Sequence, residues 1–138
     1  MTVTIFHNPA CGTSRNTLAA IRETGVEPVV VEYLKAGWTK AQLQDLVGKL
    51  GLGPRGILRT KGALAGELGL TQPSASDDAI LDAMVANPVL VERPIVVSPR
   101  GAVLARPSER VFEILDNVPA AFVKEDGERV VPGNAPQT

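Results

Sequence analysis

The sequence predicts an α/β fold in one domain, ordered as a β-α-β unit, a helical insertion and a β-β-α unit. Near the start of the chain, two short apolar runs flank a helical pattern, and a long stretch of helical periodicity follows them. A second pair of apolar runs, separated by Pro-Arg-Gly, precedes the last helical pattern. A chain of 138 residues can form one such domain with a hydrophobic core, but it is too short for two ordinary domains.

The β-α-β unit occupies the first quarter of the chain. Residues 3–6 are apolar and predict a buried strand. Residues 14–24 have helical spacing of apolar side chains, and Gly25 is a typical helix stop. Residues 28–34, built on three consecutive valines, predict a second strand. A strand, a helix and a second strand favour a right-handed crossover with parallel strands.

The insertion contains three helical stretches. In residues 39–50, Thr39 and Gln42 fit a capping box and the apolar residues keep a helical period. Residues 57–68 predict a further helix, although two glycines interrupt it. Residues 76–86 predict a third, with a serine cap and acidic residues in its first turn.

A hairpin and a helix complete the predicted fold. Residues 94–98 and 102–105 predict two antiparallel strands joined by a turn. Pro107 is well placed to begin a last helix that extends to about Leu115. This order of elements is the layout of the thioredoxin-like fold, with a cysteine at the end of the first strand.

The predicted domain spans residues 1–117. The insertion, about residues 36–92, is large for a thioredoxin-like fold, and we expect it to form a helical lobe over one side of the site. Residues 118–138 mix charged residues with Gly and Pro, which predicts a C-terminal extension that packs in part and then frays.

The composition excludes several classes of protein. A hydrophobic content of 44% argues against general disorder, and a net charge of −1 argues against a nucleic-acid binder that acts by broad electrostatics. The start of the chain has no signal-peptide pattern, and no apolar stretch reaches membrane-spanning length. A single cysteine cannot form an internal disulfide. We therefore expect a cytoplasmic protein with no membrane or nucleic-acid partner. We also expect a monomer, although the composition does not determine the oligomeric state.

Cys11, the only cysteine, lies just ahead of the first predicted helix. The unpaired N–H groups and the dipole of a helix N-terminus favour negative charge, which lowers the pKa of a cysteine there. The alternative is a small buried hydrophobic residue, as most free cysteines are. The position of Cys11 in a turn, after Pro9 and before Gly12, favours the reactive thiolate.

Two neighbours of Cys11 are further candidates. His7, the only histidine, could assist thiolate formation through its charge or through polar contacts, although a lone histidine is more often a packed or surface residue. Ser14 stands where a second cysteine would complete Cys-x-x-Cys. It could cap the helix, hydrogen-bond the thiolate, or both. Without a second thiol, reduction after one turnover must come from outside the chain.

Two other kinds of site fit the sequence poorly. One cysteine and one histidine with no convergent partner do not supply the three or four ligands of a zinc site, so we expect no metal and no tightly bound cofactor. A tyrosine phosphatase has the spacing Cys-x5-Arg, but position 17 here is threonine and Arg15 comes too early.

Three arginines occur in distinctive contexts: Arg59, Arg93 and Arg106. Arg93 enters the predicted hairpin and Arg106 leaves it, so antiparallel pairing brings them together. In a thioredoxin-like sheet the proline that enters the third strand faces the cysteine loop and is typically cis, which places Arg93 beside Cys11. Guanidinium groups offer planar, bidentate donors for a tetrahedral oxyanion.

Together these segments resemble the glutaredoxin- and glutathione-linked arsenate reductase (ArsC) family of the thioredoxin-like superfamily, from about residue 4 to about residue 131. The matching motifs are His-Asn-Pro-x-Cys-Gly-Thr-Ser-Arg-Asn-Thr at 7–17, Leu-Arg-Thr at 58–60, Arg-Pro-Ile-Val-Val at 93–97, Arg-Pro-Ser-Glu at 106–109 and Lys-Glu-Asp-Gly-Glu at 124–128. Each motif alone is modest, but in this order they are specific.

The resemblance implies an arsenate reductase of the kind that serves arsenic resistance, in which Cys11 is the nucleophile and Arg59, Arg93 and Arg106 bind the oxyanion. In this family the thiolate attacks arsenate, glutathione joins the adduct as co-substrate, As(V) becomes As(III), and glutaredoxin completes the cycle. A dianionic substrate needs converging cations, and covalent capture needs a thiolate of low pKa.

A non-enzymatic alternative is a redox regulator similar to the Spx-type proteins, which share this fold and bind RNA polymerase. Those proteins commonly carry Cys-x-x-Cys as a redox switch, which this chain lacks. They also need not keep the three arginines that this chain has.

Overall fold

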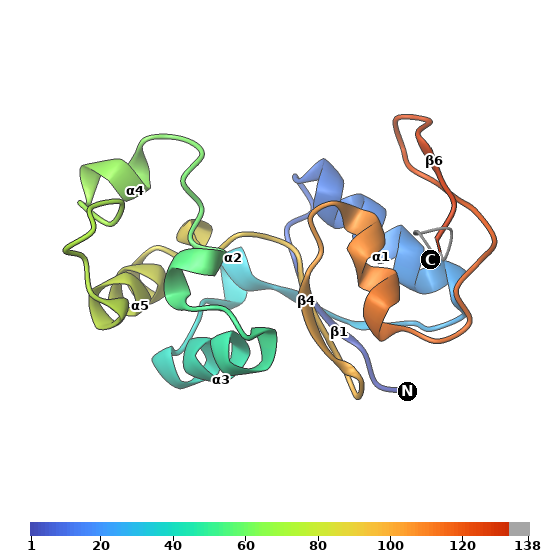
Figure 1. Cartoon of the computed structure of the whole chain (residues 1–138), viewed down its shortest axis with the longest axis horizontal. Coiled ribbons are helices and arrows are strands. Elements are labelled where there is room, and N and C mark those ends of the chain that lie inside the picture. Colours follow the sequence, from blue (N-terminus) through green and yellow to red (C-terminus); the bar gives the residue numbers. More distant parts are fainter. Residues whose placement is uncertain (133–138) are drawn as a thin grey trace, which may run out of the picture. The chain divides into compact units, whose positions relative to one another are not determined.

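The computed structural model describes residues 1–132, which form two compact units (Figure 1). The first unit comprises Met1–Glu32 and the chain from Arg93 onward, and the second comprises Tyr33–Glu92. The predicted fraying of the chain end at 133–138 lies outside the described residues. Within residues 1–132, no helix combines the length and the apolar character needed to cross a membrane.

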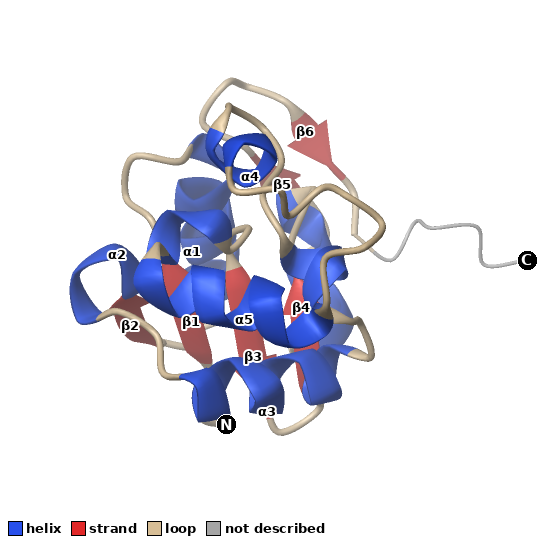
Figure 2. Cartoon of the chain, turned by 90° about the vertical axis from the view of Figure 1, so that its left-hand side faces the viewer, coloured by secondary structure: helices blue, strands red, loops and turns tan. Residues whose placement is uncertain are grey.

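The first unit contains a four-stranded sheet in the order β2-β1-β3-β4 (Figure 2). β1, Thr4–His7, pairs in parallel with β2, Val29–Glu32. β3, Ile95–Ser98, is antiparallel to β1 and forms a hairpin with β4, Gly101–Leu104. This topology confirms the predicted thioredoxin-like fold.

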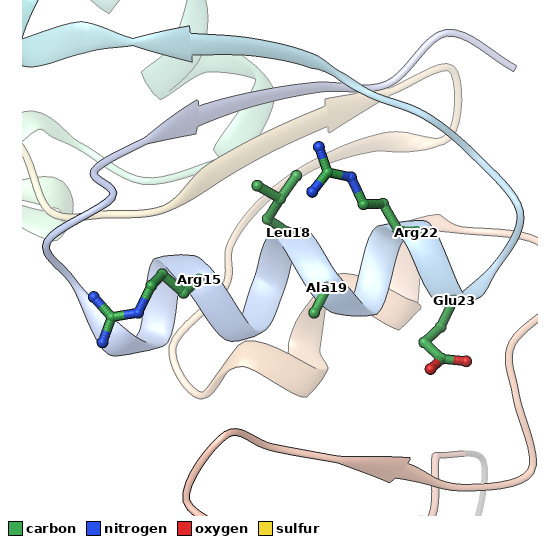
Figure 3. Close-up of a pocket in the computed structure, with 5 residues that line it drawn as sticks. All are labelled: Arg15, Leu18, Ala19, Arg22 and Glu23. Atoms are coloured by element: carbon green, nitrogen blue, oxygen red, sulfur yellow. The ribbon is translucent and has the colours of Figure 1, made fainter.

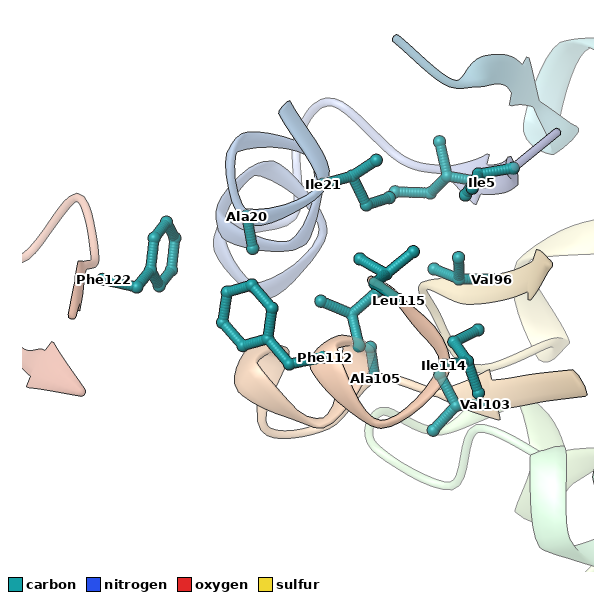
Figure 4. Close-up of a cluster of buried hydrophobic side chains, with 12 residues drawn as sticks. Ile5, Ala20, Ile21, Val96, Val103, Ala105, Phe112, Ile114, Leu115 and Phe122 are labelled. Carbon is teal, nitrogen blue, oxygen red and sulfur yellow. The ribbon is translucent and has the colours of Figure 1, made fainter. Parts of the chain in front are cut away.

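Two helices pack on this sheet: α1, Gly12–Glu23, and the 3-10 helix η3, Ser108–Ile114. Side chains from both helices meet those of the inner strands in one apolar core (Figure 4). The buried members of this core are Val3, Ile5, Ala20, Ile21, Val96, Val103, Ala105, Val111, Phe112, Ile114, Leu115 and Phe122. The core fixes the ends of β1 and α1, between which Cys11 lies.

Both predicted helices of this unit differ from the observed ones. α1 begins at Gly12, two residues earlier than predicted, because the turn before it leaves Cys11 as the N-cap residue. The last helix is 3-10 rather than α. Its buried residues Ser108, Val111 and Ile114 recur every third position, and a 3-10 helix, with three residues per turn, places them on one side.

β2 ends at Glu32, although the sequence predicted a strand through residue 34. Tyr33 instead begins the short helix α2, Tyr33–Ala36. Its ring is buried and lies 5.3 Å, centroid to centroid, from that of Trp38, and its hydroxyl donates to the Val91 carbonyl at 3.3 Å. The packing of this one side chain in the second unit therefore ends the strand.

The predicted caps of the second unit are confirmed. α3, Lys40–Leu50, begins at the capping box of Thr39 and Gln42. α5, Asp77–Ala86, has Ser76 as its N-cap, whose side chain accepts from the Ala79 N–H. A 3-10 helix, η2, Pro88–Leu90, follows α5.

The helix predicted over residues 57–68 is wrong. The 3-10 helix η1, Pro54–Ile57, precedes an extended stretch, and the only α-helical turn there is α4, Leu64–Glu67. The Glu92 N–H donates to the Ile57 carbonyl at 2.8 Å, so this stretch pairs with a distant segment instead of coiling on itself. Gly62, with φ of +90°, then turns the chain.

The C-terminal segment forms a small hairpin of β5, Phe122–Val123, and β6, Arg129–Val130. Phe122 is buried, and its ring meets that of Phe112 edge to face, with centroids 5.9 Å apart. The described part of the predicted extension is thus attached to the core of the first unit.

Candidate active site

The thiol of Cys11 lies where β1 turns into α1. The Cys11 N–H donates to the Asn8 carbonyl at 3.0 Å, and the Arg15 N–H donates to the Cys11 carbonyl at 3.0 Å. Cys11 is therefore the N-cap residue of α1, and it is partly exposed. Its side chain makes no capping hydrogen bond, so the N–H groups of the first helical turn can stabilise a thiolate when one forms.

The pKa of Cys11 lies below that of an ordinary cysteine. Burial acts to raise this pKa, but the backbone N–H of Ser14, the side chain of Arg93 and the backbone N–H of Thr13 stabilise the thiolate by hydrogen bonding and lower it. The positive charge of Arg93 acts in the same direction. Cys11 is therefore more often a thiolate at neutral pH than an ordinary cysteine is.

This lowered pKa predicts the pH dependence of thiol reactivity. We expect the rate of alkylation of Cys11 by iodoacetamide to rise and level off at lower pH than for a free cysteine, whose pKa is about 8.5. Because the chain has one cysteine, the measured rate reports Cys11 alone. Glutathione, alkylated in parallel, is the control, and a midpoint at or above the glutathione value would contradict the assignment.

Ser14 and His7 form a buried polar contact beside the cysteine turn. Nδ1 of His7 lies 2.6 Å from Oγ of Ser14, and the Asn8 N–H donates to the same Oγ at 3.0 Å. The prediction that Ser14 caps the helix is wrong, because Ser14 lies within the first turn of α1 and Cys11 is the N-cap. Its side-chain oxygen links α1 to the end of β1, and its backbone N–H donates a hydrogen bond that stabilises the Cys11 thiolate.

His7 does not contribute to the site through its charge. Burial lowers the pKa of His7, the charges of Arg22 and Arg15 lower it further, and only Glu32 acts to raise it. The imidazole is therefore uncharged at neutral pH and adds no positive charge beside the thiol. The contact with Ser14 is its observed polar interaction.

Arg93 and Arg106 come together at one end of the β3–β4 hairpin. Nη1 of Arg106 donates to the Arg93 carbonyl at 3.0 Å, and the Ala105 N–H donates to the Pro94 carbonyl at 3.0 Å. The peptide bonds Arg93–Pro94 and Arg106–Pro107 are both cis. The strand pairing thus places Arg93 at the thiol and Arg106 against the Arg93 backbone, as the hairpin pattern predicted.

Arg93 retains unused donors. Its Nε and Nη1 atoms are buried and have no hydrogen-bond partner among residues 1–132. A buried donor without a partner costs free energy, so natural proteins rarely leave one without a reason. An oxyanion bound beside Cys11 would supply acceptors and negative charge for such a group.

Arg59 belongs to the second unit. Its backbone N–H donates to the Leu90 carbonyl at 2.7 Å, and its Nη1 lies 2.8 Å from Oε1 of Glu92. Both side chains of this ion pair are mostly buried, at 16% and 22% exposed. Five of the six predicted site residues thus lie in the first unit, and the sixth is held by Glu92 in the second.

A shallow pocket of about 610 Å³ runs along α1 (Figure 3). It is lined by Arg15, Leu18, Ala19, Arg22 and Glu23. None of the predicted site residues lines it, so it does not mark the reacting centre. No group of three or more His, Cys, Asp or Glu residues within residues 1–132 is arranged to hold a metal ion.

Sequence reasoning assigned no role to Lys124 and Glu125, which contact η3 after Arg106 and α1 after Cys11, respectively. Glu125 pairs with Arg15, and Lys124 pairs with Glu109. The available signal was the motif Lys-Glu-Asp-Gly-Glu, because the partners themselves lie far away in the sequence.

The sheet topology and the single thiol at the junction of β1 and α1 define a thioredoxin-like protein whose cysteine has a lowered pKa. Residues 6–114 match the model of the ArsC family. The chain belongs to the ArsC family.

Similarity to individual proteins extends over nearly the whole chain. The chain is 55% identical over 132 residues to an arsenate reductase of Rhizobium meliloti, covering 95% of this chain and 94% of that protein. It is 51% identical over 130 residues to an arsenate reductase of a Synechocystis species, covering 94% and 93%. Among solved structures, the arsenate reductase from Vibrio cholerae matches with a TM-score of 0.80 and 44% identity, over 83% of this chain and 98% of that one.

Proposed function

We propose that this protein reduces arsenate to arsenite, with Cys11 as the nucleophile. Membership of the ArsC family and about 50% identity to arsenate reductases over most of the chain support this activity. The single observation that carries the chemistry is the thiol at a helix N-terminus beside Arg93, two of whose nitrogens are buried and have no hydrogen-bond partner among residues 1–132. The protein works as a monomer in reducing cytoplasm, where glutathione is available.

The first step of the proposed mechanism is covalent capture. The Cys11 thiolate attacks arsenic, an S–As bond forms, and one arsenate oxygen leaves and is protonated to water. Arg93 and Arg106 bind the remaining oxygens and offset their charge. Arsenic is still As(V) in this adduct, so no electrons have yet been transferred.

The second stage reduces arsenic with external thiols. Two thiols supply two electrons: arsenate and two glutathione-equivalent thiols give arsenite, one disulfide and one water. Glutathione forms a second S–As bond as another arsenic oxygen leaves as water. The glutaredoxin thiolate then attacks the glutathione sulfur, so the pair of the As–S bond passes to arsenic, which becomes As(III), and a glutathione–glutaredoxin disulfide leaves. Hydrolysis of the Cys11–arsenic bond releases arsenite and restores the thiol. Ser14 occupies the place of a resolving cysteine, so the chain cannot finish this cycle alone.

The decisive test is arsenite formation from arsenate by the purified protein with glutathione, glutaredoxin and glutathione reductase. We expect turnover in the complete system and none when glutathione is withheld. The separation of arsenite from arsenate by chromatography gives the product directly. Absence of arsenite in the complete system would refute the proposed activity.

A separate prediction concerns the electron donor. With thioredoxin and its reductase in place of glutathione and glutaredoxin, we expect turnover at least about tenfold slower, because a dithiol reductant attacks a protein disulfide and one cysteine cannot form an internal one. The control is a dithiol arsenate reductase assayed with both systems. Equal rates for this protein in the two systems would contradict the glutathione step while leaving arsenate reduction intact.

A further inference from the structure

The C-terminal hairpin, residues 122–130, contacts α1, which follows Cys11, and η3, which follows Arg106. The proposed mechanism gives no role to its motif Lys-Glu-Asp-Gly-Glu at 124–128. Residues 124–127 form the turn: the Gly127 N–H donates to the Lys124 carbonyl at 2.9 Å, Oδ1 of Asp126 accepts from the Glu128 N–H at 2.9 Å, and Gly127 has φ of +93°. Two adjacent residues of this turn, Lys124 and Glu125, form ion pairs with residues outside the hairpin.

Glu125 contacts the start of α1 and, through Arg15, the turn before Cys11. Its two carboxylate oxygens accept from Nε and Nη2 of Arg15 at 3.0 and 2.7 Å, and Nη1 of Arg15 donates to the Pro9 carbonyl at 2.8 Å. The Glu125 N–H also donates to Oδ1 of Asn16 at 2.9 Å. One guanidinium therefore joins the hairpin to the turn before Cys11, and the bidentate geometry fixes its orientation.

The approach of Glu125 to this loop is close. A Cβ added at Gly12, the residue after Cys11, would lie 3.1 Å from Oε1 of Glu125. Glycine at this position therefore leaves room for the carboxylate at the start of α1. The hydrogen bond to Glu125 raises the pKa of Arg15, and the negative charge of a Cys11 thiolate acts in the same direction.

Lys124 pairs with η3, the 3-10 helix that follows Arg106. Its Nζ lies 2.9 Å from Oε1 of Glu109 and 3.4 Å from Oε2 of Glu128, and its side chain is only 10% exposed. Burial acts to lower the pKa of Lys124, but the two carboxylates raise it, so the ammonium stays charged. Glu109 lies in η3, three residues after Arg106, so this pair fixes the segment that presents Arg106.

We propose that Lys124 and Glu125 are positioning residues of the active site. Glu125 holds the Cys11 loop through Arg15, and Lys124 holds the Arg106 loop through Glu109. Phe122, packed against Phe112, anchors the hairpin that carries both. The assignment of Lys124 rests on the proposed arsenate reduction, whereas that of Glu125 concerns the reactivity of the thiol and can be tested without arsenate.

A positioning role of Glu125 and a simple effect of its charge predict opposite shifts of the Cys11 pKa when Glu125 is replaced. Removing a negative charge near the thiol would by itself stabilise the thiolate and lower the Cys11 pKa. Releasing Arg15 from its fixed orientation loosens the turn at Pro9, so the N–H groups of Ser14 and Thr13 stabilise the thiolate less, and the pKa rises. The direction of the shift therefore separates a positioning role from a simple charge effect.

The first experiment compares Glu125→Gln with Glu27→Gln, using the pH dependence of Cys11 alkylation. Glu27 is a matched control, because it binds Arg22 of the same helix through two contacts of 3.0 Å. We expect Glu125→Gln to raise the Cys11 pKa by about half a unit or more, which lowers the thiolate-dependent rate at low pH about threefold. Glu27→Gln leaves the profile unchanged. An unchanged or lower pKa in Glu125→Gln would overturn the assignment.

A double-mutant cycle tests the path through Arg15. We expect the double variant Arg15→Gln with Glu125→Gln to show the same pH profile of Cys11 alkylation as Arg15→Gln alone. A full additional shift in the double variant would show that Glu125 does not act through Arg15 and would overturn that part of the proposal.

The second experiment tests Lys124 through arsenate kinetics. We expect Lys124→Met to raise KM for arsenate at least about fivefold while the alkylation profile of Cys11 stays unchanged, since only the Arg106 loop is loosened. Lys49→Met, which removes an exposed pair with Asp45 on α3, is the control. A raised Cys11 pKa, or an unchanged KM, would overturn the role of Lys124.

Lys124→Met leaves Glu109 without its partner and could unfold the chain. The double variant Lys124→Met with Glu109→Gln removes the pair without leaving a charge at position 109, and Glu128, which also loses Lys124, is exposed. We expect this variant to fold and to show the same raised KM. A normal KM in this folded double variant would also overturn the proposal. A wild-type protein that forms no arsenite refutes the proposed function instead, and the Glu125 experiment still decides the role of Glu125.

Discussion

Replacing Cys11 with serine is expected to reduce arsenite formation to the rate of the reaction without enzyme. The serine hydroxyl is not ionised at neutral pH, and neither Ser14 nor Arg93 can make it a nucleophile of comparable strength. No other thiol in the chain can replace Cys11. The measurement is arsenite production in the complete glutathione system, with wild-type protein at the same concentration.

The same variant should be as stable as the wild type or more stable. Cys11 is the N-cap of α1 and makes no capping hydrogen bond, whereas serine is among the preferred N-cap residues. A gain of about 1 kcal/mol in the free energy of unfolding is reasonable for such a cap, and it would raise Tm by about 3 °C in a chain of this size. A thermal melt by circular dichroism tests this. Substantial activity in the folded variant would exclude Cys11 as the nucleophile.

Local signals in the sequence were sufficient for much of the fold. Thr39 and Gln42 form the capping box at the start of α3, and Ser76 caps α5, because caps depend on residues three or four positions apart. The position of Cys11 ahead of a helix and the meeting of Arg93 with Arg106 followed from strand and helix patterns alone. These features depend on short-range geometry or on one antiparallel hairpin.

Contacts between distant segments account for the wrong predictions in the second unit. Residues 57–68 have helical spacing, but Leu58 forms a bridge with Val91, more than thirty positions later, and the extended stretch results. Arg55 donates to the carbonyls of Gln72 and Ala75 at 2.8 and 2.6 Å, which holds the following loop without a helix. No local pattern indicates either contact.

In the candidate site, too, contacts between distant segments were not predicted from the sequence. Ser14 was predicted to cap the helix from its residue type, but the start of α1 is set by the turn at Asn8, which moves the cap to Cys11. The pairing of Arg15 with Glu125 spans 110 positions. The composition of residues 118–138 indicated a loosely packed extension and gave no sign that the hairpin reaches the site.

Arg93→Lys is expected to lower kcat/KM for arsenate on the order of 10²-fold, comparable to the loss of one preorganised donor in an oxyanion site. Lysine keeps the positive charge beside Cys11 but loses the planar guanidinium, which offers two parallel donors to an oxyanion. We therefore expect the alkylation profile of Cys11 to stay close to that of the wild type while arsenate reduction falls. Arg93→Met removes the charge as well, so it should also raise the Cys11 pKa.

The stability of these variants distinguishes a functional arginine from a structural one. Nε and Nη1 of Arg93 are buried without partners within residues 1–132, so the loss of these two donors relieves an unfavourable burial, and the contact of the guanidinium with Cys11 is the interaction that is lost. We expect neither Arg93 variant to lower Tm, because residues kept for activity are often neutral or costly for stability. Arg100→Lys is the matched control: Arg100 is exposed on the hairpin turn and pairs with Asp116 at 2.6 Å, so kcat/KM should change less than about twofold. Equal losses of activity in Arg93→Lys and Arg100→Lys would show that Arg93 does not act on the substrate.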